Sequence, residues 1–134
     1  MKDARFAFGD NIIPLKAPVD SAGTAYASPW VDLKNALHAT FFYYAGVVTA
    51  ASAADQNIVI TMEAATAAAS GSEVAIAFKY RLSGATGANT WGDITAATSA
   101  GYSYATDADG KMLLIDVDPA GLDSALADAR FVRM

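Results

Sequence analysis

The chain has few residues that could perform nucleophilic or acid–base chemistry. His38 is its only histidine, and it has no cysteine. A serine nucleophile needs a base beside it, and no serine lies in the Gly-x-Ser-x-Gly turn that exposes the nucleophile of many hydrolases. Because a single histidine beside an aromatic segment is usually structural, we expect no catalytic residues and no enzymatic activity.

Two pairs of aspartates could bind a cation or act on a glycosidic bond. Asp116 and Asp118 would share one face of a strand, where two carboxylates can form a glycosidase pair, although a solvated outer face is a simpler explanation. Asp107 and Asp109 precede Gly110 as in a calcium loop. No glutamate closes that loop, and Asp-Gly is a strong hairpin-turn signal. We therefore expect neither a metal nor a cofactor.

The aromatic residues Trp30, Trp91, Tyr102 and Tyr104 suit recognition better than catalysis. Their rings could stack on sugars, as in a carbohydrate-binding or adhesin module. Aromatic side chains are also frequent anchors of protein interfaces. A place in the core or in an interface is the favoured interpretation, and the carbohydrate module is the alternative.

Charge and hydropathy argue against two classes of partner. The net charge is -5 and the pI is near 4.5, whereas nucleic-acid binding needs Lys and Arg to displace counterions. Nowhere do about eighteen apolar residues follow one another, and the residues after Lys2 and Arg5 lack the apolar run of a signal peptide. We expect a soluble protein, made in the cytoplasm, that binds neither nucleic acid nor membranes.

Alternating apolar residues, separated by Gly, Ser, Ala and Asp clusters, predict short strands of a sandwich or barrel. The clearest strands are expected at 58–63, 73–82 and 112–118, with shorter ones at 29–33 and 130–134. Tyr102 and Tyr104 are expected to pair with residues 112–118 across the Asp109-Gly110 turn. We interpret residues 64–69 as a loop, with a helical turn as the alternative, and we expect a single helical turn to begin at Asp118.

The strand expected at 39–48 differs because both of its faces are apolar. Phe41 and Tyr43 would point to one side, and Phe42 and Tyr44 to the other. A strand of a two-layer antiparallel fold normally turns one face to water. The second aromatic face therefore needs a cover, either the N-terminal part of the same chain or a partner subunit.

Residues 1–27 form an apolar segment without strand or helix periodicity, and they precede the strand-rich residues 28–134. Apolar side chains lie there among Gly9, Pro14, Pro18 and Gly23. Such a segment cannot bury itself, so we expect an extended N-terminal arm followed by one antiparallel β-sandwich domain. Contacts with partners are expected from the arm, the aromatic strand and the two tryptophans: Phe6, Phe8, Ile12, Ile13, Leu15, Trp30, Phe42, Tyr44 and Trp91.

Several stretches after Ser28 resemble a family of small structural proteins encoded beside the capsid genes of tailed bacteriophages and prophages. They are Trp-Val-Asp-Leu-Lys-Asn at 30–35, Tyr-Arg at 80–81, Ser-Gly-Ala-Thr-Gly at 83–87, Thr-Trp-Gly at 90–92, Asp-Ala-Asp-Gly-Lys at 107–111 leading into 113–118, and Ala-Arg-Phe-Val-Arg at 129–133. The arm is not part of the resemblance. The family carries no catalytic residues to transfer.

The resemblance implies a virion protein that decorates and cements the outer capsid surface by bridging subunits of the major capsid protein. It also implies a jelly-roll-like β-sandwich that assembles as a dimer or trimer. Such a protein would be made in the host cytoplasm and located on the capsid. A head-tail connector or tail component of the same virion would have the same sequence features and is a further alternative.

Overall fold

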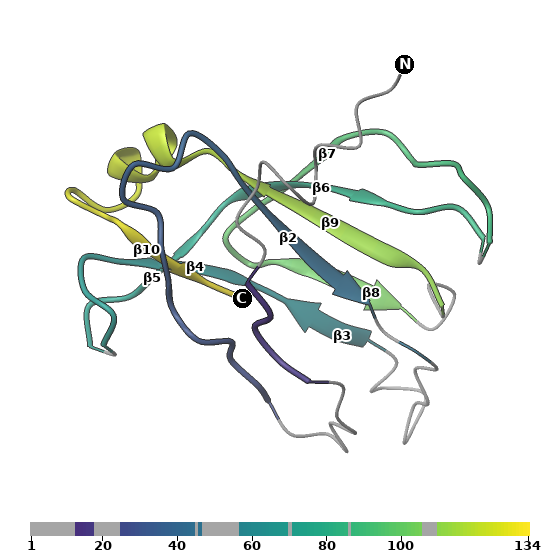
Figure 1. Cartoon of the computed structure of the whole chain (residues 1–134), viewed down its shortest axis with the longest axis horizontal. Helices are drawn as coiled ribbons and strands as arrows, with labels where there is room; N and C mark the ends of the chain where they lie inside the picture. Colours follow the sequence, from purple (N-terminus) through teal and green to yellow (C-terminus); the bar gives the residue numbers. More distant parts are fainter. Residues whose placement is uncertain are drawn as a thin grey trace.

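The structure is a computed structural model that describes residues 13–17, 25–44, 46, 57–69, 71–85, 87–105 and 110–134. Figure 1 shows its strands and one short 3-10 helix, η2. In chain order these are β1 (Val31–Asp32), β2 (Ala39–Tyr44), β3 (Asn57–Ile60), β4 (Met62–Ala65), β5 (Val74–Ile76), β6 (Phe78–Leu82), β7 (Thr95–Ala97), β8 (Tyr102–Ala105), β9 (Met112–Val117), η2 (Pro119–Ser124) and β10 (Phe131–Arg133).

The described part of the chain is mostly β, as predicted, and its strand pairs are antiparallel. One four-stranded sheet has the order β1-β10-β4-β5, another has the order β2-β9-β6-β7, and β3 pairs with β8 in a two-stranded sheet. Several neighbours, such as β1 with β10 and β2 with β9, come from distant parts of the sequence. The last strand, β10, therefore lies between β1 and β4.

The region predicted as one strand at 73–82 is in fact two strands in different sheets. β5 pairs with β4, and β6 pairs with β7 and β9. Ala77 separates β5 from β6. The alternation of side chains continues through this break, since Ile76 and Phe78 are both buried, which is why the pattern alone did not reveal it.

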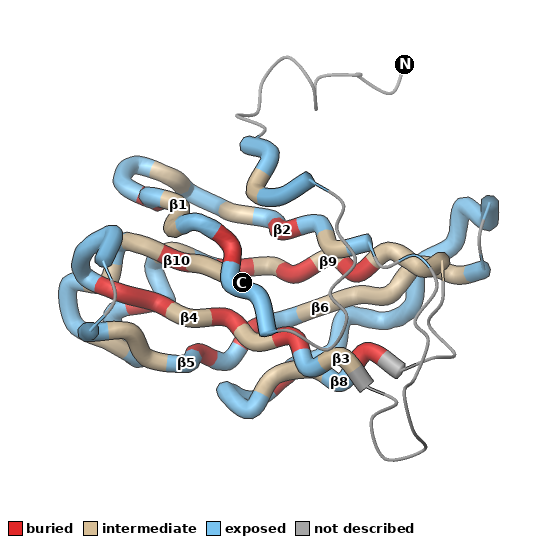
Figure 2. Tube along the Cα trace, turned by 90° about the horizontal axis from the view of Figure 1, so that it is seen from below, coloured by how far each residue is buried: buried red, intermediate tan, exposed pale blue. Residues whose placement is uncertain are grey.

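The core collects large side chains from all three sheets. Tyr104, Met62, Leu113, Ile115 and Val132 are the largest fully buried residues, and they belong to one cluster with other buried side chains. Figure 2 shows buried positions along both β4 and β9. The Tyr104 hydroxyl donates a hydrogen bond of 2.6 Å to the Lys111 carbonyl, so its polar atom is satisfied inside the core.

The predicted hairpin between Tyr102, Tyr104 and residues 112–118 is wrong. β8 pairs with β3 in the register Ile58↔Tyr104 and Ile60↔Tyr102, whereas β9 pairs with β2 and β6. Asp107 and Asp109 lie outside the described residues. A strong turn dipeptide thus did not determine which strands pair.

The loop expected at 64–69 is wrong in its first two residues. Ala64 and Ala65 end β4 and are fully buried, where β4 lies between β10 and β5. Small side chains fit this crowded central position, and pairing with strands from distant parts of the chain overrides the weak β propensity of alanine.

The helical turn expected after Asp118 is confirmed. The Asp118 side chain accepts a hydrogen bond of 3.0 Å from the Ala120 amide, and Pro119 occupies the first turn of η2. β9 ends at Val117, so Asp118 lies outside the strand that contains Asp116, and its carboxylate caps η2.

Candidate functional site

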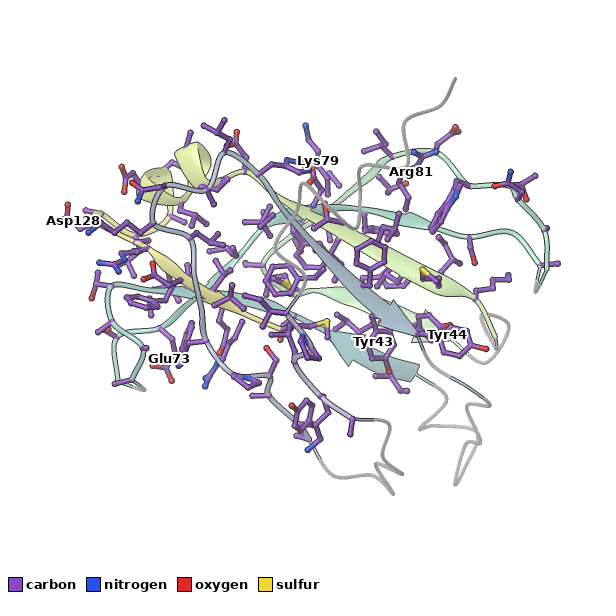
Figure 3. All side chains as sticks on the ribbon, in the orientation of Figure 1. Tyr43, Tyr44, Glu73, Lys79, Arg81 and Asp128 are labelled. Carbon is purple, nitrogen blue, oxygen red and sulfur yellow. The ribbon has the colours of Figure 1, made fainter. Side chains whose placement is uncertain are left out.

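The outer face of the β2-β9-β6 sheet brings together most of the aromatic and charged residues of interest. Register places Thr40, Asp116 and Lys79 in one cross-strand row, and Phe42, Leu114 and Arg81 in the next. Directly opposed residues share a sheet face. Lys79 and Arg81 extend from the same side of β6 (Figure 3).

The predicted division of the aromatic strand into two faces is confirmed. Phe41 is buried, and Tyr43 packs edge to face on Tyr104 with ring centroids 5.5 Å apart. Burial raises the pKa of the Tyr43 phenol above its ordinary value. On the opposite face, the exposed fractions of Phe42 and Tyr44 are 51% and 61%. β2 therefore presents aromatic surface to the outside of its sheet.

Trp91 lies on the second arm of a hairpin that follows β6 and continues this outer face. Ser83 and Trp91 form an antiparallel bridge, the Gly84 amide donates to the Thr90 carbonyl at 2.8 Å, and the Gly92 amide donates to the Leu82 carbonyl at 2.9 Å. Arg81 Nε donates to the Gly92 carbonyl at 3.2 Å. The hairpin is thus fixed to β6 on both sides of the indole.

The indole also has a charged neighbour. The Arg81 guanidinium lies 5.9 Å from the centroid of the Trp91 ring, within the range of a cation–π contact. Arg81 therefore lies beside Leu114 in the cross-strand row and also contacts Trp91 in the hairpin.

Tyr44 and Trp91 line a common cavity of about 270 Å³. Tyr44 ends β2, and Trp91 follows β6 across the hairpin. The sequence identified both residues as contact candidates but did not predict that they meet. Their proximity depends on β9, which pairs with β2 on one side and with β6 on the other.

The only histidine of the sequence, His38, lines a second cavity of about 350 Å³. His38 Nε2 lies 2.8 Å from Asp116 Oδ1 and 3.2 Å from Thr40 Oγ1. Asp116 Oδ1 is buried, and its contact with His38 is a hydrogen bond only when Nε2 carries the proton. Lys79 and Arg81 also line this cavity.

The His38 contacts differ from those of a catalytic triad. In a triad, one ring nitrogen faces the nucleophile and the other faces the carboxylate. Here the same nitrogen meets both the Thr40 hydroxyl and the Asp116 carboxylate. The contacts place the ring beside β9 and lack the two-sided arrangement of a triad.

The remaining predicted contact residues lie elsewhere or outside the described residues. Trp30 is half-buried in a different cluster, with the Arg133 guanidinium 4.4 Å from its ring centroid, and Arg133 Nε donates to Glu63 at 2.6 Å. Ile13 is exposed, and Leu15 packs against the core. Phe6, Phe8 and Ile12 lie outside the described residues.

Sequence reasoning missed Leu114 and Ile94 as members of the outer face. Leu114 lies between Phe42 and Arg81 in register, and Ile94 is 66% exposed and lines the cavity beside His38. The strand alternation of residues 112–118 places the Leu114 side chain on the other face of the strand from Leu113 and Ile115. That signal could have identified it as an outward apolar residue.

The described residues contain no group of three His, Asp or Glu side chains arranged to hold a metal ion. In the same part of the chain, no helix has the length and apolar character needed to cross a membrane. Comparison with family models, curated proteins and solved structures found no match.

Proposed function

We propose that this chain is a non-enzymatic virion protein that decorates and cements the outer surface of a tailed-phage capsid. In this proposal, the outer face of β2-β9-β6 and the arm at 1–27 contact the major capsid protein and neighbouring copies. The observation that carries the proposal is the exposed aromatic and apolar surface of that face. Exposed apolar patches on small proteins commonly mark interaction sites.

The composition of this face suits a protein partner. Phe42 and Tyr44 supply aromatic area, Leu114 and Ile94 supply aliphatic area, and Arg81 supplies a cation. Aromatic residues and arginine are enriched among the residues that contribute most to protein–protein binding. Lys79 and Asp116 provide polar groups beside this apolar area, as at the rim of many interfaces.

The strand order supports a jelly-roll-like β-sandwich. We count β3 with β4 as one bent strand, and β5 with β6 as another. One layer then has the order β1-β10-β4/β3-β8, and the other has the order β2-β9-β6-β7. Two four-stranded sheets in this order are the arrangement of a jelly roll, a fold common among viral capsid and lectin domains. Because one fold serves many functions, the fold supports the proposal less strongly than the exposed face does.

The charge of the chain fits an outer position on the capsid. With a net charge of -5, the protein would be repelled by packaged nucleic acid. The proposal includes self-association as a dimer or trimer at capsid symmetry positions, since a small domain that cements a shell acts by bridging subunits.

Co-sedimentation with empty capsids of the encoding phage tests the proposal. Phe42→Ala and Tyr44→Ala should each weaken capsid binding by about tenfold, as expected for central interface residues. Leu37→Ala is the matched control, because Leu37 is 96% exposed and lies outside β2. Equal binding by the wild type, both aromatic variants and the control would refute the assigned face.

Deletion of residues 1–27 tests the arm separately. The proposal predicts weaker capsid binding by the shortened chain, while its circular dichroism keeps the β signature. Undiminished binding would exclude the arm from the contact. A head-tail connector or tail component is the second assignment within the same virion, and binding to purified tails but not to capsids would favour it.

A further inference from the structure

The described residues that line the cavity between Tyr44 and Trp91 are uncharged. Besides the two rings, the lining contains the Asn89 amide, the Ser83 side chain and five smaller or flexible positions: two alanines, two glycines and one methionine. The chain has nine basic and fourteen acidic residues, and none of those that the structure describes lines this space. A phosphate or carboxylate would find no opposing charge on this part of the lining.

The two aromatic residues line the same small volume. Tyr44 is 61% exposed and Trp91 is 36% exposed, so both have accessible surface. The volume of about 270 Å³ is just below the usual range of ligand pockets. It has room for a single ring and not for a folded segment of protein.

The polar groups beside the rings match hydroxyl groups. The Asn89 amide carries both donors and an acceptor, and the exposed Asn89 makes no side-chain hydrogen bond that would fix its orientation within the described residues. Ser83 Oγ is already engaged, because it accepts from the Met112 amide at 2.8 Å and lies 3.2 Å from the Gly84 carbonyl. Asn89 is therefore the side chain best able to bind a ligand hydroxyl.

The site is held in place before any ligand arrives. The hairpin hydrogen bonds at Gly84 and Gly92, and the contacts of Arg81 with Gly92 and Trp91, fix the indole. β9 fixes Tyr44 through its pairing with Met112. Preorganised groups lose less entropy on binding, which favours recognition of a small ligand.

We propose that this cavity is a binding subsite for a neutral sugar ring, and we call it the Tyr44–Trp91 subsite. The C–H face of a pyranose would stack on Trp91 or Tyr44, and its hydroxyls would bind Asn89 and backbone groups of the hairpin. Sugar binding does not depend on capsid binding. Because Tyr44 also belongs to the face that we assign to capsid contact, the subsite would be open to sugars in the free protein.

Isothermal titration calorimetry and ligand-observed NMR test the subsite with glucose, galactose, mannose, N-acetylglucosamine and their β1–4-linked disaccharides. At least one should bind the wild type saturably. Trp91→Ala and Tyr44→Ala should each weaken that binding by at least about tenfold, and Asn89→Ala should weaken it measurably. Glucuronic acid and sialic acid should bind no better than the neutral sugars, and 0.5 M NaCl should leave the affinity unchanged, since the described lining residues carry no charge.

Trp30→Ala is the matched control, because Trp30 is the other tryptophan of the chain and lies against Arg133 in a different cluster. It should keep full sugar binding. Trp91→Tyr should retain part of the binding, which separates stacking from misfolding. Absence of saturable binding by any neutral sugar at 20 mM, or equal binding by Trp91→Ala and the wild type, would overturn the proposal. Capsid co-sedimentation of the same variants reports separately on the proposed function.

Discussion

Asp32 in β1 and Arg130 just before β10 form a two-point ion pair between the beginning and the end of the domain. Arg130 Nε donates to Asp32 Oδ1 at 2.6 Å, and the second guanidinium nitrogen contacts Oδ2. The Lys34 amide also donates to Oδ1, at 2.9 Å. The Arg130 hydrogen bond first, and then the Lys34 amide, lower the pKa of Asp32 from 3.8 to about 2.

This ion pair predicts a specific acid sensitivity. A carboxylate whose pKa is lower in the folded state stabilises the fold above its unfolded pKa, and that contribution is lost as the pH falls through the folded pKa. For Asp32 the window lies between about pH 4 and pH 2. Asp32→Asn should therefore reduce the loss of stability in that window, which urea unfolding at pH 6, 4 and 2.5 would measure. The same pH dependence in the variant and the wild type would contradict the assignment.

Any side chain at position 101 should lower the free energy of unfolding. The φ of Gly101 is +92°, and a Cβ atom built there would lie 2.5 Å from the Ile60 carbonyl oxygen. Gly101→Ala should destabilise the fold by about 2 kcal/mol or more, because both the backbone and the β3–β8 pairing must shift. The free energy of chemical unfolding measures the effect.

Gly121→Ala is the matched control for Gly101→Ala. Gly121 lies in η2, where an added Cβ atom would meet nothing within 4 Å and φ is outside the left-handed region. Its stability should remain within about 1 kcal/mol of the wild type. Equal losses in the two variants would show that the contact with Ile60 does not determine the cost.

Removing the Tyr104 hydroxyl should show how much one buried hydrogen bond contributes to the free energy of unfolding. The Tyr104 side chain is fully buried, and its hydroxyl donates to the Lys111 carbonyl at 2.6 Å. Tyr104→Phe keeps the ring and its packing on Tyr43 but leaves that carbonyl without this donor. We expect a loss of about 1 to 2 kcal/mol in the free energy of unfolding. An unchanged thermal midpoint would argue against a structural role for this hydrogen bond.

The sequence predicted the local features of this fold well. Alternation correctly divided Phe41 and Tyr43 from Phe42 and Tyr44, and Asp118 followed by Pro119 marked the start of η2. These features depend on neighbouring residues, because strand periodicity and helix capping are local properties.

Pairing across long distances could not be predicted in the same way. Tyr104 pairs with Ile58 and not with β9, and the alternation of side chains did not show the change of sheet at Ala77. The meeting of Tyr44 and Trp91 around one cavity depends on both neighbours of β9. Strand order depends on the packing of the whole core, so the sequence patterns identified Tyr44 and Trp91 as candidates but did not predict that they meet.

Electron microscopy of empty capsids mixed with the purified protein tests the central claim most directly. Our account predicts added density on the outer shell surface, with the β2-β9-β6 face and its Phe42, Leu114 and Arg81 row directed at the major capsid protein or at a neighbouring copy. Undecorated capsids at saturating protein, or density in which this face points into solvent, would contradict it.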